Sequence, residues 1–265
     1  MIARLAVLMT LGATAVAAAQ TVDIARRVTA APDGQVRFSY AAREGVYGNG
    51  GGSIAWGCRN EGGRCRQTRN DDDESEWQSP CDTGPVRVSL TVHGGTVTSL
   101  RAYVGGQWRS STGATDLGTV STRDATRYLL DLATHATGRA GHEAIFAATL
   151  ADSVTIWPDL LKIARNATIQ SETRKQAVFW LGQAAGDAVT KDLSDLVDDT
   201  SLDVEVKKSA VFALSQLPHD DGVPALIAVV RNNHSGEVRK NALFWLGQSG
   251  DPRALALFEE ILTRP

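Results

Sequence analysis

The chain has 265 residues, of which 43% are hydrophobic, and this is enough to bury the cores of two domains of ordinary size. It carries 27 Lys and Arg against 30 Asp and Glu, a formal net charge of −3. Residues 1–140 hold 15 basic and 13 acidic side chains, and residues 141–265 hold 12 and 17. Neither half shows the clustered basic face that neutralises phosphates, so nucleic acid is not an expected partner.

Residues 1–19 have the pattern of a secretory signal peptide. A lone Arg4 precedes an apolar run from Leu5 to Val16, and three small residues, 17–19, come before Gln20. We expect cleavage after Ala19 and therefore a periplasmic or secreted protein. A membrane span needs about 20 apolar residues, and neither this run nor any later one meets that length. No membrane span is expected.

Residues 20–120 have a strand-like pattern rich in glycine. Residues 35–40 alternate polar and apolar side chains, which is typical of a strand with one buried face. Val86, Val88, Leu90 and Val92 alternate in the same way, and a turn at residues 93–96 leads into a second run at 97–104. This spacing predicts a β-hairpin within a small β-rich domain.

The β-rich region contains all three cysteines, Cys58, Cys65 and Cys81. In an exported chain, three cysteines predict one disulfide and one free thiol, but the spacing does not say which two pair. Zinc is not indicated because no C-x-x-C motif occurs. The acidic residues 70–76 lack the glycine of an EF-hand loop, so we interpret them as a solvated loop. No metal or cofactor is expected.

Residues 121–140 are expected to form a linking helix. Ser121 or Thr122 is a suitable N-cap, and Leu129, Leu130 and Leu132 supply an apolar side up to about His135. The glycines at 138–141 should break this helix. Its position suggests that it covers the first of the units that follow.

Residues 141–265 contain several copies of one sequence motif. Ala144, Ala177, Ala210 and Ala242 occupy equivalent positions, 33, 33 and 32 residues apart. Three copies are full and the first is degenerate. Each full copy opens a helix with an acid followed by two bases, as in Glu172 and residues 174–175, and a second helix completes the unit. Helical hairpins at this period predict an α-solenoid.

The repeat also carries a family resemblance. Residues 237–247, with Gly250 and Asp251, resemble the HEAT-like repeat of the phycobilisome-lyase type, over roughly residues 141–265. The expected fold class is therefore α+β, with a small β-rich N-terminal domain followed by a C-terminal α-solenoid of HEAT-like helical hairpins. The resemblance implies mainly a protein-binding scaffold.

A helical wheel centred on Ala177 places an aromatic row on the outer surface of the solenoid. At about 100° per residue, Leu181 and Val178 fall on the core side with Ala177, whereas Phe179 falls opposite them. Trp180 and Trp245 are expected on the core side. In the alternative, neighbouring helices bury the phenylalanines and the row is simply core. The residues predicted to bind a partner are Phe146, Phe179, Phe212, Phe244, Gln183, Gln216 and Gln248.

The sequence thus favours an exported scaffold that binds a protein partner. One alternative is an enzyme, since the HEAT-like resemblance extends to bilin lyases and to an iron hydroxylase that holds its metal with paired His-Glu motifs. Only His142-Glu143 has that form here, and no catalytic residue is assigned. A further alternative is a structural envelope protein whose solenoid packs against its own β-rich domain.

Overall fold

The computed structural model describes residues 23–48, 50, 54–56, 59–61, 64–66, 83–108, 113–136, 138–183, 187–217 and 221–263. The expected signal peptide, Cys58, Cys81 and the acidic loop at 70–76 lie outside these residues. Cys65 lies on a described strand, but its side chain is not described. The expected disulfide therefore stays a prediction.

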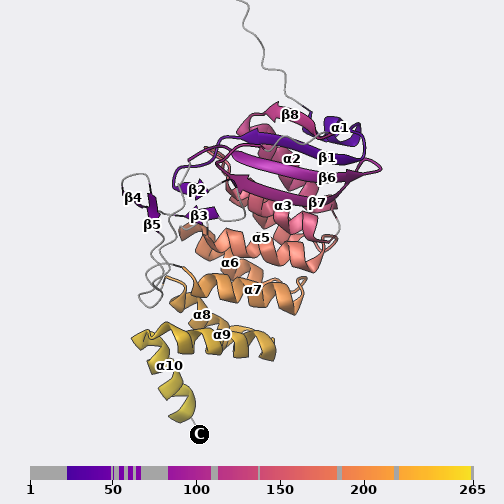
Figure 1. The fold of residues 1–265 in the computed structure, drawn as a ribbon. Coiled ribbons are helices and arrows are strands. Elements are labelled where there is room, and N and C mark those ends of the chain that lie inside the picture. Colours follow the sequence, from indigo (N-terminus) through magenta and orange to yellow (C-terminus); the bar gives the residue numbers. More distant parts are fainter. Residues whose placement is uncertain are drawn as a thin grey trace, which may run out of the picture.

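A four-stranded sheet forms the N-terminal layer of the molecule (Figure 1). Its order is β7-β6-β1-β8, where β1–β6 and β6–β7 are antiparallel and β1–β8 is parallel. The strands at 35–40, 86–92 and 97–104 and the hairpin between the last two are confirmed. The bounds are β1 Gly34–Tyr40, β6 Val86–His93, β7 Thr96–Val104 and β8 Thr115–Thr119.

Short elements accompany this sheet. Helix α1 (Ile24–Thr29) precedes β1, and the sequence reasoning missed it. Asp23 caps α1, since its Oδ1 accepts a hydrogen bond of 3.1 Å from the Arg26 N–H. Two small hairpins form sheets of their own: β2 (Val46–Gly48) with β3 (Ile54–Trp56), and β4 (Arg59–Glu61) with β5 (Arg64–Arg66).

The linking helix is confirmed as α2, Thr122–His135. The Ser121 hydroxyl caps it by accepting a hydrogen bond of 3.1 Å from the Asp124 N–H. The expected break is narrower than residues 138–141, because α3 begins at Arg139 and contains Gly141. Gly138, with φ of +67°, makes the turn between the two helices.

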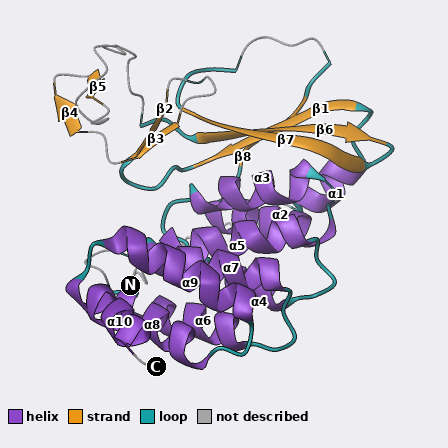
Figure 2. Ribbon diagram, turned by 90° about the horizontal axis from the view of Figure 1, so that it is seen from below, coloured by secondary structure: helices purple, strands orange, loops and turns teal. Residues whose placement is uncertain are grey.

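From α2 to α10 the elements that the structure describes are all helices, and they lie in two layers (Figures 1 and 2). Helices α3, α5, α7 and α9 stack in one layer, and α4, α6 and α8 each pack against the following helix of that layer. The bounds are α3 Arg139–Thr149, α4 Trp157–Arg165, α5 Ser171–Gln183, α6 Asp187–Asp198, α7 Val204–Ser215, α8 Val223–Asn232, α9 Gly236–Ser249 and α10 Pro252–Thr263.

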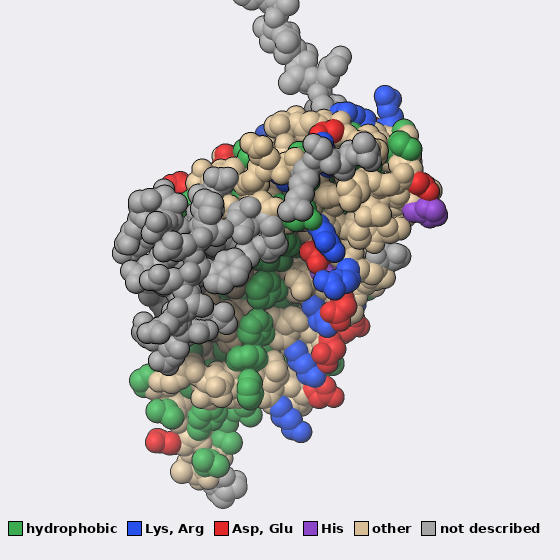
Figure 3. Space-filling view, in the orientation of Figure 1, with side chains coloured by type: hydrophobic (Ala, Val, Ile, Leu, Met, Phe, Trp, Pro, Cys, Tyr) green, Lys and Arg blue, Asp and Glu red, His purple; other side chains and the backbone are tan. Residues whose placement is uncertain are grey.

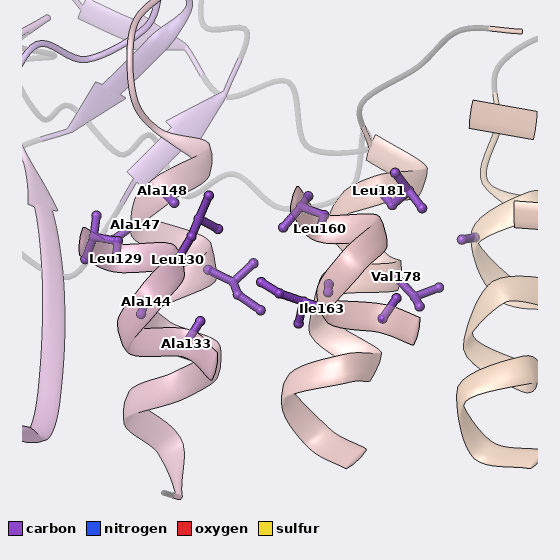
Figure 4. Packing of buried hydrophobic residues seen from close by; sticks show 14 of the residues in the cluster. Leu129, Leu130, Ala133, Ala144, Ala147, Ala148, Leu160, Ile163, Val178 and Leu181 are labelled. Atoms are coloured by element: carbon purple, nitrogen blue, oxygen red, sulfur yellow. The ribbon is translucent and has the colours of Figure 1, made fainter. Parts of the chain in front are cut away.

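The sheet lies directly against the first helices. Strand β7 packs on α3, and the Tyr40 hydroxyl donates a buried hydrogen bond of 2.5 Å to the Ala147 carbonyl. Figure 2 shows the sheet as a layer over α2 and α3. One cluster of buried apolar side chains runs from the sheet through all the helix pairs. Figure 4 shows its part between α2, α3, α4 and α5, including Leu129, Leu130, Ala144, Leu160, Ile163, Val178 and Leu181.

The described helices are also too short or too polar for one of them to cross a bilayer.

Candidate partner-binding surface

The four predicted phenylalanines lie on four successive helices of one layer. Phe146 lies on α3, Phe179 on α5, Phe212 on α7 and Phe244 on α9. Phe244 is 56% exposed and the other three are half-buried. Figure 3 shows hydrophobic side chains in a column over α5, α7 and α9 that continues onto α10. Part of each ring is therefore accessible to solvent, and Phe146 also packs against the hydrophobic core.

Trp180 and Trp245 join these rings into one continuous array. The Trp180 ring centroid lies 5.5 Å from that of Phe146 on the preceding helix and 5.0 Å from that of Phe179. Trp245 repeats the arrangement, at 4.9 Å from Phe212 and 5.0 Å from Phe244. Each tryptophan thus bridges the phenylalanine of its own helix to that of the helix before.

Helices α5 and α7 are joined without a tryptophan. Phe179 and Phe212 stack directly, with ring centroids 6.4 Å apart and an interplanar angle of 9°. Ala213 of α7 takes the place that tryptophan has on α5 and α9, so no bulky ring stands between the two phenylalanines. The six rings form what we call the aromatic ladder: Phe146, Trp180, Phe179, Phe212, Trp245 and Phe244.

The expectation that both tryptophans are core residues is only partly met. Both are half-buried and lie in ring contact with the surface phenylalanines. The Trp245 Nε1 is buried and donates to no acceptor among the described residues. The dipeptide Phe-Trp at 179–180 and 244–245 was the available signal, because adjacent aromatic residues on a helix lie only about 100° apart.

One flank of the aromatic ladder is a line of paired charges. Lys175 Nζ lies 2.5 Å from a carboxylate oxygen of Glu172. Lys208 Nζ lies 3.0 Å from Glu205 and 3.2 Å from Glu237 of the next repeat. The hydrogen bonds to Glu205 first, and then to Glu237, raise the pKa of Lys208. Figure 3 shows basic and acidic side chains alternating beside the hydrophobic column. This flank has no strong net charge.

The other flank consists of amides. Gln183, Gln216 and Gln248 are exposed, each four residues after the phenylalanine of its helix. Because residues i and i+4 are neighbours on a helix surface, each amide stands one turn beyond a ring. A side-chain amide offers two donors and one acceptor. These glutamines can therefore form hydrogen bonds with the backbone of a partner that binds across the ladder.

Few features elsewhere suggest a reaction. His142 Nε2 lies 3.7 Å from a Glu143 carboxylate oxygen, and both side chains are half-buried. Within the described residues there is no group of three His, Cys, Asp or Glu side chains placed to hold a metal ion. A groove of about 410 Å³ between α2 and α4 is lined by charged and apolar side chains alike. Unlike these features, the aromatic ladder repeats the same kind of side chain on four successive helices. A repeated aromatic surface of this kind is suited to contact with a partner.

A search of curated proteins found no match to the chain. A match to a family model covers α7 to α10 and agrees with the resemblance seen in the sequence. Residues 200–265 match the model of the HEAT repeats, so the C-terminal part of this chain consists of HEAT-like repeats.

Proposed function

We propose that the chain is an exported scaffold that binds a protein partner along the aromatic ladder. HEAT repeats commonly mediate protein–protein interaction, and the matched segment includes the half of the ladder on α7 and α9. The observation that carries the proposal is the unbroken contact of six rings across four helices, with Phe244 56% exposed. Aromatic side chains anchor interfaces because they supply a large area with few rotatable bonds.

The two flanks define the chemistry of the partner. On one side Lys175 and Lys208 are already paired with glutamates, and on the other side the polar groups are uncharged amides. A strongly charged partner would gain little from this surface. The favoured partner presents apolar side chains to the rings and backbone polar groups to the amides. Its binding should therefore depend only weakly on salt concentration, since screening acts on unpaired charges.

Export and the disulfide belong to the same proposal. Residues 1–19 support export through their apolar run and the small residues before Gln20. An oxidising compartment would allow two of the three cysteines, Cys58, Cys65 and Cys81, to pair. Intact-mass measurement of the protein from its native host tests both points. A mass that includes residue Met1, or three free thiols without reduction, would contradict them.

The partner is tested by affinity capture from the envelope of the native host, with the full chain as bait. We expect a stoichiometric protein that is lost when Phe179→Ala and Phe212→Ala are combined. Ile227→Ala is the matched control, because it removes a half-buried apolar side chain from α8 in the other layer. Retention of the partner by the double variant would overturn the role of the ladder, as would equal loss in the control.

A further inference from the structure

The linking helix and the second helix of the first repeat form a groove between them. Helix α2 lines one side, and α4 with the segment before it lines the other. The groove has a volume of about 410 Å³, and sites for small organic ligands have roughly 300–1,000 Å³. It lies where the part of the chain under the sheet joins the first repeat (Figure 2), and ligand sites favour such junctions. We call it the α2–α4 groove.

The base of this groove is apolar. Leu130 of α2 and Ile163 of α4, both labelled in Figure 4, are buried and line the groove. Val154, which precedes α4, also lines it and is half-buried against the hydrophobic core. Because the buried side chains of a groove lie deepest, a ligand would place an apolar body over these three residues.

One buried hydroxyl in the lining has no partner. Thr126 lines the groove and is 3% exposed, and its Oγ1 forms no hydrogen bond within the described residues. Buried hydroxyls are nearly always paired, since an unpaired one destabilises the folded state. Thr126 stands three residues after Arg123 and four before Leu130, so the three share one side of α2. A ligand oxygen in the groove would accept the hydrogen bond that this hydroxyl lacks.

The charges that line the groove do not cancel. There are three bases, Arg123, Arg127 and Lys162, and two acids, Asp131 and Asp159. Lys162 Nζ lies 2.7 Å from Asp159 Oδ1, so this pair contributes no net charge. Two arginines and one aspartate remain, and they leave a formal charge of +1. A ligand with a single anionic group would complement this charge.

The two arginines are available to such a group. Arg123 is exposed, and no hydrogen bond or ion pair engages it in the part of the chain that the structure describes. Arg127 Nη1 lies 3.7 Å from Asp124 Oδ1, which is too long for a hydrogen bond. Arg123 is the second residue of α2, where the helix dipole disfavours a cation, so the stability of α2 does not explain it. Guanidinium groups bind carboxylates through two parallel hydrogen bonds.

We propose that the α2–α4 groove binds a small organic anion, a free alkyl carboxylate. Its carboxylate contacts Arg123 and Arg127, and one carboxylate oxygen accepts the hydrogen bond of Thr126. Its alkyl chain covers Leu130 and Ile163. The groove shares no residue with the aromatic ladder, so this proposal does not depend on the protein partner.

The experiment titrates octanoate into the ¹⁵N-labelled full chain and follows the backbone amides by NMR. We expect saturable shifts on α2 and α4 with a dissociation constant below about 1 mM. Acetate has the charge without the chain, and octylammonium has the chain with the opposite charge, so both should bind at least about tenfold more weakly. The proposal is overturned if octanoate does not saturate, if it shifts only the helices of the ladder, or if octylammonium binds equally well.

Variants then test the assigned contacts. Arg123→Gln should raise the dissociation constant of octanoate at least about fivefold, whereas Arg26→Gln, the control at an exposed arginine on α1, should not change it. Thr126→Val keeps the shape of the side chain. It should raise this constant about threefold without lowering the stability of the fold, because the hydroxyl that it removes is unpaired. Equal affinity of the Arg123 variant and the control would contradict the site. Combining Phe179→Ala with Phe212→Ala should leave octanoate binding intact, so the two proposals fail separately.

Discussion

Residues 179–180 and 244–245 show what a single-helix projection can and cannot predict. The wheel placed Phe179 away from the core, and in the structure the ring is half-buried. It placed Trp180 on the core side, but the indole also reaches the Phe146 ring of the preceding helix. A wheel contains one helix only, so it cannot show a ring that fills the space between two helices. The role of the row in binding stays a prediction.

Trp245 offers a test of this bridging role. Trp245→Phe keeps an aromatic ring between Phe212 and Phe244 and removes a buried N–H that has no acceptor among the described residues. We expect its free energy of unfolding to stay within about 1 kcal/mol of the wild type. Trp245→Ala removes the bridge and should lower that free energy by about 2–3 kcal/mol.

Urea denaturation followed by far-UV circular dichroism measures both variants without relying on tryptophan fluorescence. Equal stability of the phenylalanine and alanine variants would contradict a packing role for this ring.

The role of Arg174 was also beyond the sequence reasoning, which noted this residue only as the first of two bases that follow Glu172. It is only 5% exposed. Its Nε donates a hydrogen bond of 3.0 Å to the Ile169 carbonyl, and its Nη2 pairs with the Asp203 carboxylate of the next repeat. Both partners lie in connections between helices, and a repeat pattern does not predict how such connections fold back on a helix.

At the scale of elements, prediction succeeded where the pattern is local and periodic. The helices at equivalent 33-residue positions and the strands β1, β6 and β7 follow from the side-chain spacing alone. Helix α1 has six residues, too few for a periodic pattern to stand out, although Asp23 and the buried pair Ile24 and Val28 were a usable signal. Strand β8 was missed because it pairs in parallel with β1, which is distant in the sequence. Pairing of this kind produces no pattern in the neighbouring residues.

Two equivalent glycines, Gly182 of α5 and Gly247 of α9, test how tightly each helix is packed at this position. Gly182→Ala would push a methyl group against Ala213 of α7, and this overpacking should lower the free energy of unfolding by about 1–3 kcal/mol. Gly247→Ala meets no close neighbour, so its higher helix propensity should raise that free energy by about 0.5–1 kcal/mol. The two substitutions are chemically identical and serve as each other's control.

Thermal or urea denaturation measures the pair. A loss of stability in Gly247→Ala similar to that in Gly182→Ala would mean that another surface packs on α9.

For the whole molecule, the continuous core predicts a gradient of local stability. Helices α2 and α3 lie between the sheet and the α4–α5 pair, whereas α10 packs mainly against α8 and α9 among the described elements. In stacked repeats each unit depends mainly on its neighbours, so the end with fewer neighbours opens first. Backbone amides of α10 and α9 should exchange with solvent fastest, and those of α3 and β6 slowest.

Hydrogen–deuterium exchange with mass spectrometry measures this order. Faster exchange in β6 than in α9 would show that the sheet opens independently of the helices, contrary to the shared core.

The closure of one end by the sheet has an implication for evolution. A tandem duplication of one 33-residue segment near the C-terminus would lengthen the solenoid and add further aromatic rings to the ladder. Every contact between the sheet and the first helices would stay unchanged. The same event next to α2 would have to preserve the fit between sheet and helices to be tolerated. Among descendants of such a chain, variation in repeat number should therefore accumulate at the end distant from the sheet.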